Sequence, residues 1–415
     1  KVNSVELYAD ENPISEVIVK HLRAGKIKLL AKLRELGYSY SDLIKEANII
    51  ESKYSNDNQT SLSPSLGFNK QQSLVGEVLV KRRASLVLKV VAEEMIISNR
   101  SECHRLGYNY KHEQVLIYER KELTIPEDVP TVFIDADAQE SILDKFRKKV
   151  RFEKIDVKRL AIFHQASDLT FSKNLLIHKE EKTDKVQQEI KQFIRQIAKE
   201  GLTLVVCSKA IRAELTGEDK MLMEQESNLE GAAIIHFGNL RGLNEYSHYR
   251  NVIILGREQP SAEGIENNAR SLFWDDKESI KFVPFKGKHK PLENEERLIY
   301  LRDGSNHKVS VQIHPDKRVQ LLLDQSRESE SLQAIDRLRL LRPHEGGERN
   351  VYILSSIPLG LTIDNLFSWT QLQKLVDLLE KAKGIIPLNP KHLMKICPVT
   401  ATRERTAKRL NSDLK

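Results

Sequence analysis

The chain has 415 residues, of which 40% are hydrophobic and 30% charged, and its formal net charge is +7. This length allows two or three domains with separate cores, and the composition excludes a chain that is disordered throughout. No stretch approaches the roughly 20 consecutive apolar residues of a membrane-spanning helix, and no signal-like segment opens the chain. We therefore expect a cytoplasmic protein without a membrane partner.

The cysteines and the net charge indicate which kinds of site and partner to expect. Cys103, Cys207 and Cys397 lie far apart and form no CxxC pair, which favours buried free thiols over a zinc site or a disulfide framework. The positive charge favours polyanionic partners. Because the first residue is Lys1 and the last residues stop within a helical pattern, we expect a fragment of a longer polypeptide.

The first 120 residues are expected to be mostly helical. Apolar residues recur at helical spacing over residues 13–50, which predicts two helices separated at Gly37, the second capped by Ser41. Residues 55–73 are rich in Ser, Asn and Gln and are expected to form a surface loop or linker. Helix is predicted again over residues 72–101.

A different pattern begins near residue 121. The short apolar run TVFID (131–135) predicts a strand, with a helix from about Ala138. Further on, helices alternate with the apolar runs LTLVVCS (202–208), AAIIHF (232–237), NVIILG (251–256) and NVYILSSIPL (350–359). This alternation predicts an α/β fold with a parallel sheet, whose ligand edge should be the carboxyl ends of the strands.

Two further elements complete the chain. Residues 296–322 predict a β-hairpin with the turn DGSN (303–306), inserted upon the sheet. Three helix-like segments from Trp369 onward predict a small helix-turn-helix or winged domain at the C-terminal end.

The sequence lacks a nucleotide-binding P-loop of the form GxxxxGK[ST]. The nearest stretches, AGKIK, GFNKQ and TGEDK, do not have its spacing. Backbone N–H groups and a lysine of that loop hold the phosphates of a bound triphosphate. The chain is therefore not expected to hydrolyse ATP unaided.

Six stretches follow one another in a recognisable order: VFIDADA (132–138), TLVVCS (203–208), HFGNLRGLN (236–244), VIILGREQP (252–260), QAIDRLRLLRP (333–343) and VYILSSIPL (351–359). This order resembles the later half of a superfamily 2-type helicase, particularly the helicase-like replication proteins of phages and plasmids. The resemblance covers roughly residues 120–360. It implies RecA-like parallel-sheet domains with a helical N-terminal region.

The resemblance also implies a division of the chain into four regions. Residues 1–120 would be a helical region or an insertion of the first domain, and 121–183 the end of a first RecA-like domain with its linker. Residues 184–360 would form the second RecA-like domain, with the hairpin insertion at about 285–325, and 361–415 the C-terminal helical domain.

Three departures from the family stand out. Asp336 occupies a position that is usually Gly, and Leu340 falls at the second arginine position while Arg339 lies one residue earlier. About ninety residues separate GNLRGLN from QAIDRLR, more than the family norm. The Walker A loop and a DExH or DEAD box are missing, so we expect them upstream of Lys1.

The resemblance assigns roles to named residues. Arg337 would be the arginine finger that reaches the γ-phosphate, with Arg339 as second choice and Gln333 on the same helical face as Arg337. The alternative is an amphipathic helix whose charges are only solvated. The corner residues would sense the nucleotide, with Gly242 in a positive-φ conformation, although an ordinary glycine turn is the simpler interpretation. These corner residues are Gly238, Arg241, Gly242 and Asn244.

The acids after TVFID, Asp135 and Asp137, would couple ATP hydrolysis to strand movement. Two alternatives are a Walker B strand that binds Mg²⁺ and a simple helix N-cap at Asp137. Nucleic acid would contact residues that follow the core strands: His236, Arg257, Gln259 and Lys209, which follows Ser208. The basic stretches 145–159 and 402–409 could neutralise phosphates or simply be solvated faces.

We therefore expect the C-terminal part of an ATP-dependent DNA helicase or translocase that serves replication of a mobile element. It would supply the arginine finger and part of a nucleic-acid groove, and ATP and Mg²⁺ would bind only together with the missing N-terminal part. Single-stranded or forked DNA, ATP and replication proteins are the expected partners. The alternative is a non-enzymatic DNA-binding replication initiator or scaffold.

Overall fold

The structure is a computed structural model, which describes residues 2–5, 13–25, 28–61, 84–97, 100–126, 128–135, 138–155, 157–177, 181–223, 225–240, 242–286, 290–381, 383 and 389. The chain forms two compact units. Unit 1 consists of Lys1–Glu153, Pro260–Glu293 and His314–Leu323. Unit 2 consists of Lys154–Gln259, Asn294–Ile313 and Asp324–Lys415.

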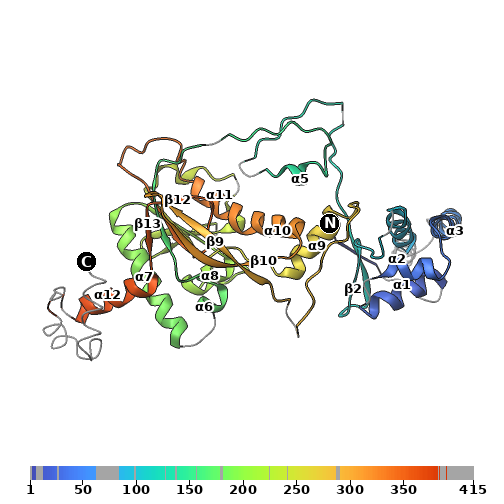
Figure 1. Cartoon of the computed structure of the whole chain (residues 1–415), viewed down its shortest axis with the longest axis horizontal. Coiled ribbons are helices and arrows are strands. Elements are labelled where there is room, and N and C mark those ends of the chain that lie inside the picture. Colours follow the sequence, from blue (N-terminus) through green and yellow to red (C-terminus); the bar gives the residue numbers. More distant parts are fainter. Residues whose placement is uncertain are drawn as a thin grey trace. The chain divides into compact units, whose positions relative to one another are not determined.

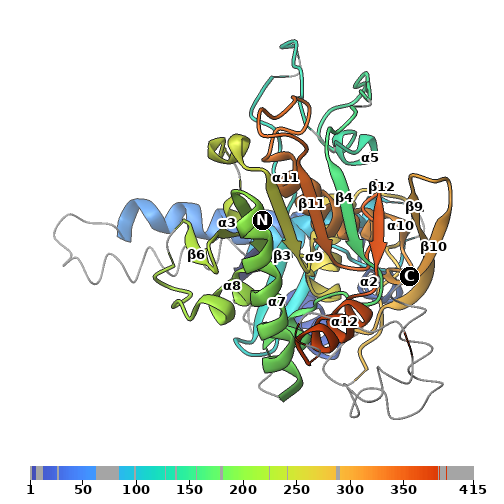
Figure 2. The ribbon, with the colours of Figure 1, turned by 90° about the vertical axis from the view of Figure 1, so that its left-hand side faces the viewer.

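Unit 2 is built on a seven-stranded sheet with the strand order β13-β4-β11-β8-β5-β7-β6. Neighbouring strands are parallel, except that β6 is antiparallel to β7. Figure 2 shows β4 and β11 side by side in this sheet. The strands are β4 (Ile162–Ala166), β5 (Thr203–Cys207), β6 (Ser227–Leu229), β7 (Ala232–His236), β8 (Asn251–Leu255), β11 (Asn350–Leu354) and β13 (Asn365–Phe367). The predicted α/β class with a mostly parallel sheet is confirmed.

Alternate residues of each strand face opposite sides, so the sheet carries two separate cores. On one face, Val206, Ile254 and Ile353 pack with Ile335 of α11 (Glu330–Asp336) and with the hairpin. On the other face the sheet packs against helices α6 (Lys173–Ile177), α7 (Glu181–Glu200), α8 (Lys209–Thr216) and α12 (Trp369–Lys381). Every residue of β5 and β8 is buried, as expected for strands covered on both faces.

Helix α7 shows how the sequence directs a helix to one face of the sheet. Its buried residues Val186, Ile190, Ile194 and Ile197 recur at three- and four-residue spacing, so they form one stripe toward the sheet. Full burial of each such side chain stabilises the fold by about 1.5–3 kcal/mol relative to an exposed one. Exposed residues of α7, such as Arg195 and Gln196, lie between these buried positions.

The predicted hairpin forms, but it ends at Ile313, whereas the prediction extended it to residue 322. Residues 317–322 belong to helix α10 (Lys317–Asp324). Strands β9 (Glu293–Leu301) and β10 (Asn306–Ile313) are neighbours in a three-stranded sheet that also contains β12 (Thr362–Ile363) (Figure 1). In the turn between them Gly304 has a φ of +86°, a conformation that side-chain-bearing residues rarely adopt. The Leu301 N–H donates to the Ser305 carbonyl at 2.9 Å, which closes the turn.

The prediction of a strand at TVFID (131–135) is wrong. Residues 131–135 are extended but belong to no sheet, and the side chains of Val132 and Ile134 are 85% and 95% exposed. A β-branched run becomes a strand only when a neighbouring strand supplies hydrogen bonds, and none does so here. The helix that follows is the single turn α5 (Glu140–Leu143). Further along, β4 lies within 121–183 yet pairs with β11, so it belongs to the same sheet as the strands of 184–360.

Unit 1 combines helices with a small antiparallel sheet. The sheet has the order β1-β3-β2, formed by β1 (Val2–Val5), β2 (Leu106–Asn109) and β3 (Gln114–Tyr118). Its helices are α1 (Pro13–Arg23), α2 (Leu29–Glu35), α3 (Tyr40–Ser61), a helix over 84–96, α9 (Ala262–Leu272) and α10 (Lys317–Asp324). One core joins the first four helices to β2 and β3, and a second surrounds α9 and α10.

The helices over residues 13–61 correct the sequence prediction. Three helices form where two were predicted, because the chain turns at Gly25 as well as at Gly37, with φ values of +63° and +82°. The cap of α3 is Ser39 and not Ser41: the Ser39 N–H donates to Asp42 Oδ2 at 2.8 Å, and the Asp42 N–H donates back to Ser39 Oγ at 3.4 Å. Helix α3 then continues to Ser61, into the range predicted as a loop.

Of the three predicted C-terminal helices, the structure describes the first, as α12. The other two, and with them the predicted helix-turn-helix or winged domain, lie outside the described residues. Among the helices that the structure describes, none is both long enough and apolar enough to cross a membrane.

Candidate functional site

Two of the predicted motifs meet in unit 2. Arg337 follows the last residue of α11, and its Nη1 donates to the Leu243 carbonyl at 3.1 Å. The guanidinium of Arg339 donates to the side-chain oxygen of Asn244. Residues from QAIDRLR and from GNLRGLN, more than ninety positions apart, are therefore in direct contact.

The local backbone explains the altered order of Arg339 and Leu340. Ala334, Ile335 and Leu338 are fully buried and anchor the end of α11 against the sheet. Arg339 then adopts a left-handed conformation with a φ of +55°, so the backbone turns away from the helix axis at this residue. As a result Leu340 enters the core at 1% exposure while Arg339 remains exposed.

Asp336, where the family usually has Gly, also has a structural partner. Its carboxylate accepts two hydrogen bonds from Arg159, from Nε at 2.7 Å and from Nη2 at 2.8 Å. Such a bidentate pair fixes the orientation of both groups. It ties the end of α11 to the segment before β4. Gln333 lies one turn earlier on α11, on the same face as Arg337, and is half-buried.

The corner after β7 is a sequence of tight turns. Gly238 lies in the short 3-10 turn Phe237–Asn239, and Asn244 directly precedes a second one, Glu245–His248. Gly242 has a φ of +81°, which confirms the predicted positive φ. Buried Phe237, Leu240 and Tyr246 anchor the corner on the sheet. Arg241 lies outside the described residues.

This contact lies at the amino ends of the strands, and not at the carboxyl edge that was expected to hold it. The Arg250 and Asn251 N–H groups donate to the Leu202 carbonyl, and the Asn350 N–H donates to the Arg250 carbonyl, where β5, β8 and β11 begin. The loop of residues 337–349 connects α11 to β11, and Arg349 at its end donates to the Arg339 carbonyl at 3.1 Å. The residues after α11 therefore come to the point where β11 starts. The corner likewise leads the chain from the end of β7 back to the other edge of the sheet, where β8 starts.

The other predicted residues lie at the opposite, carboxyl edge. In the register of the sheet Cys207 is paired with His236, and Val206 with Ile254, so the ends of β5, β7 and β8 are aligned. Ser208 caps α8 by accepting from the Ile211 N–H at 3.4 Å, and Lys209 is exposed on its first turn. Burial and the nearby Arg212 and Lys209 lower the pKa of His236, so it carries no positive charge at neutral pH.

Arg257 and Gln259, after β8, are half-buried at this carboxyl edge. Burial, and then the charge of Arg327, lower the pKa of Arg257 to about 10. Arg257 Nη1 and Gln259 Oε1 are buried without a hydrogen-bond partner. The two side chains therefore point at least partly into the protein, which limits their access to a nucleic acid.

A charged cluster that the sequence did not indicate lies close to Arg257. It is carried by the π-helical turn Gln325–Ser329, where Arg327 is fully buried and donates to the Gln312 carbonyl and to Asp324 Oδ1, both at 2.7 Å. Arg297 donates to Glu328 Oε1 at 3.2 Å. Only the i,i+3 spacing of Asp324 and Arg327 could have signalled an ion pair. The π turn itself has no sequence signature.

Of the two predicted coupling acids, the structure describes Asp135. Asp135 belongs to the extended segment of unit 1 and is exposed, and Asp137 lies outside the described residues. In the part of the chain that the structure covers, no group of three or more His, Cys, Asp or Glu side chains could hold a metal ion. Arginine donors alone would fit phosphate oxygens but not Mg²⁺.

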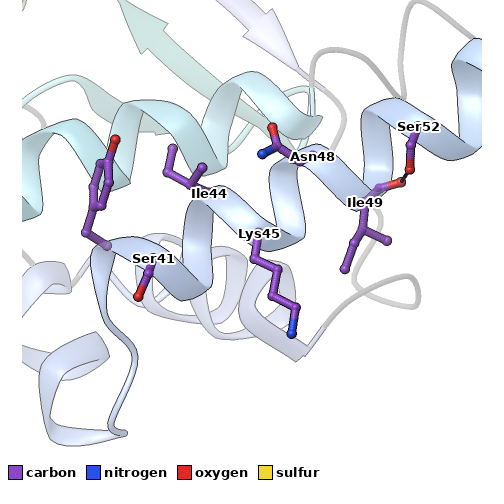
Figure 3. Close-up of a pocket in the computed structure, with 7 residues that line it drawn as sticks. Ser41, Ile44, Lys45, Asn48, Ile49 and Ser52 are labelled. Atoms are coloured by element: carbon purple, nitrogen blue, oxygen red, sulfur yellow. Dashed lines mark hydrogen bonds between the residues drawn. The ribbon is translucent and has the colours of Figure 1, made fainter.

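A hollow of about 580 Å³ lies along α3 in unit 1 (Figure 3). Its lining residues all come from this one helix and include Ile44, Lys45 and Ile49. None of the predicted site residues is among them. The hollow therefore does not compete with the arginine contact in unit 2 as a candidate site.

No family model, curated protein or solved structure matches the chain.

Proposed function

We propose that unit 2 acts as the second RecA-like domain of an ATP-dependent DNA helicase or translocase in the replication of a mobile element. The contact of Arg337 and Arg339 with Leu243 and Asn244 is the observation that supports this proposal. The two stretches were assigned to one nucleotide site from their sequences alone. They meet, but at the amino ends of the strands and not at the carboxyl edge where the sequence predicted that ligands bind. In this proposal the P-loop and the Mg²⁺ ligands are carried outside residues 1–415.

The electrostatics of the arginine pair suit a phosphate. In the described part of the chain neither Arg337 nor Arg339 forms an ion pair with a carboxylate. Burial, and then the charge of Arg339, lower the pKa of Arg337. Two neighbouring guanidinium groups repel each other, and an anion between them would relieve that repulsion.

Exposure divides the roles between the two arginines. Arg337 is half-buried and braces the corner through the Leu243 carbonyl, whereas Arg339 is exposed and uses one of its donors on Asn244. A guanidinium has five N–H donors, so Arg339 retains donors for phosphate oxygens. We therefore assign the γ-phosphate contact to Arg339 and the bracing role to Arg337. Such a group stabilises the charge that spreads over these oxygens in the transition state.

The test is DNA-stimulated ATP hydrolysis by a longer polypeptide that adds the P-loop domain. Arg339→Ala is expected to lower kcat by roughly a thousandfold with little change in KM, because the finger acts in the transition state. Arg342→Ala is the matched control, since Arg342 is exposed on the same loop. Full turnover in both Arg339→Ala and Arg337→Ala would contradict the proposal.

The second candidate, a non-enzymatic DNA-binding initiator or scaffold, is favoured by the basic stretch 145–159. Lys148, Lys149, Arg151, Lys154 and Lys158 are all exposed on it. If this surface contacts about three phosphates, the affinity for fluorescein-labelled single-stranded DNA should fall at least about tenfold between 50 and 200 mM salt. Salt-dependent DNA binding without any ATP hydrolysis would favour this candidate, and a flat salt response would exclude both kinds of DNA contact.

A further inference from the structure

A buried arginine outside every predicted motif ties the two loops of the candidate site together. Arg349 directly precedes β11 and is 4% exposed. Its Nη1 donates to the carbonyls of Arg339 at 3.1 Å and Arg342 at 2.9 Å. Its Nη2 donates to the Ser247 carbonyl at 2.7 Å. One guanidinium thus binds three backbone oxygens from two segments that are more than ninety residues apart in the sequence.

The segment that Arg349 holds contains an unfavourable backbone conformation. Arg339 has a φ of +55°, in the left-handed region that residues with a side chain rarely occupy. Such a conformation persists only when the surroundings enforce it. The carbonyl of Arg339 itself accepts from Arg349, so this hydrogen bond acts on the strained residue directly.

Two more contacts join the same loops. His344 Nδ1 accepts from the Gly346 N–H at 3.0 Å, which leaves Nε2 as the donor to the His248 carbonyl at 3.1 Å. Arg250 Nε lies 3.4 Å from the Glu348 carbonyl. Both contacts involve exposed groups, whereas Arg349 is buried and makes three bonds. Arg349 is therefore the principal link.

A buried guanidinium that binds only carbonyls lacks a compensating negative charge. In the described part of the chain Arg349 has no ion pair, and burial lowers its pKa. A side-chain amide has only two N–H donors for the three oxygens. A lysine ammonium has three, but all on one nitrogen, so it could not reach the oxygens with the spacing of the planar guanidinium. The planar guanidinium of arginine can donate to carbonyls of both loops at once and so fixes the distance between them.

We propose that Arg349 is a positioning residue that holds Arg339 in its left-handed conformation and so keeps the Arg337–Arg339 pair on the Leu243–Asn244 corner. Its effect on catalysis rests on the proposed function, whereas the link between the loops does not. The simpler alternative is that Arg349 only stabilises the start of β11. The two interpretations differ in whether the effect of Arg349 passes through Arg339.

The first measurement is backbone hydrogen–deuterium exchange in the chain of residues 1–415. Arg349→Gln and the charge-conserving Arg349→Lys should raise exchange in residues 243–250 and 339–343 and leave β5 and β7 unchanged. Arg342→Gln is the control, because Arg342 contributes its carbonyl, and not its side chain, to the link. Unchanged exchange in both loops, with either variant folded, would overturn the proposal.

The second measurement is kcat in the longer polypeptide with the P-loop domain. Arg349→Lys should lower kcat by about a hundredfold with KM nearly unchanged, the loss expected for a displaced catalytic group. In an Arg339→Ala background the same substitution should cause no further loss, although its effect on Tm should persist. An equal loss in both backgrounds would show a merely structural role. Failure of the proposed function is separate: Arg339→Ala would then have no effect while the exchange result stands.

Discussion

Asn244 is the residue at which the corner and the end of α11 are joined through side chains. Its Oδ1 accepts from the guanidinium of Arg339, and both side chains are exposed. An amide oxygen is a neutral acceptor, so this hydrogen bond is weaker than one to a carboxylate would be. Under the proposed function, such a contact would orient Arg339 and still allow it to turn toward a phosphate.

Asn244→Asp should convert this contact into an exposed ion pair. We expect a gain in the free energy of unfolding of at most about 0.5 kcal/mol, because solvent screens the pair, and the gain should vanish at high salt. In the ATPase assay the same change should lower kcat, since Arg339 would be held away from the nucleotide. Urea unfolding at low and high salt and steady-state kinetics check both effects.

Asn268→Asp, at an exposed position of α9, controls for the added negative charge. A gain in stability of the same size in both variants would show that general electrostatics, and not the contact with Arg339, is responsible. A rise in kcat for Asn244→Asp would contradict the idea that release of Arg339 matters.

Among the elements, the π-helical turn Gln325–Ser329 brings several charged side chains together in a buried place. It buries Arg327 and brings Glu328 beside Asp324, with Arg297 and Arg257 facing the same group. Burial, and then the charge of Asp324, raise the pKa of Glu328 to about 7. Removing Arg327 would leave the Gln312 carbonyl without this donor, and Asp324 and Glu328 would keep the hydrogen bonds from Arg297. Breaking a buried ion pair in this way costs up to about 3–5 kcal/mol.

The raised pKa of Glu328 gives the stability of unit 2 a defined pH dependence. An unfolded glutamate titrates near a pKa of about 4.3, so the folded chain binds this proton more tightly than the unfolded chain. The resulting stability is fully present below that value and is lost as pH rises through about 7. Glu328→Gln should therefore reduce the fall in the urea midpoint between pH 5 and 8.5.

The control for this prediction is Glu345→Gln, at an exposed loop position. It should leave the pH dependence as in the unaltered chain. If Glu328→Gln and the unaltered chain lose stability equally over this range, the titrating group is not Glu328.

Strands β5 and β8 were predictable because each contains a continuous apolar run, as expected where both faces are buried. The run TVFID carries the same local signal, yet it forms no strand, because pairing depends on a neighbour that local sequence does not specify. The candidate site shows the same limit. Arg337, Arg339 and Asn244 were identified from motif order, but the left-handed turn at Arg339 and the role of Arg349 depend on distant contacts.

At the scale of the whole molecule, the chain passes repeatedly between the two units. Each unit consists of three separate segments, so neither is a continuous stretch of sequence. The four-region division expected from the resemblance assumed continuous stretches. Interleaved segments make long-range contacts a large part of the fold, which favours slow folding and discourages simple excision of a domain.

In unit 1, removal of the first 153 residues would break many contacts of the segment Pro260–Glu293. Ile142 and Phe146 pack against the cluster around α9, and Arg120 pairs with Asp275 at 3.1 Å. Arg100 Nη1 donates to the Asp276 carbonyl at 3.1 Å, and His104 Nε2 accepts from the Ile280 N–H at 3.2 Å. All these partners of Pro260–Glu293 lie in the first 153 residues.

A chain that begins at Lys154 should therefore lose the order of residues 262–280 while keeping the sheet of unit 2. The cores of that sheet draw their buried residues from Phe163 onward, so β5 and β8 do not depend on the removed part. We expect amide exchange over 262–280 to approach that of an unfolded segment, with β5 and β8 still protected, and dye binding to the exposed apolar side chains of α9. Retained protection of α9 in the shortened chain would mean that its contacts with α10, which this chain keeps, are enough to hold it. A loss of protection throughout would mean that the two units fold only together.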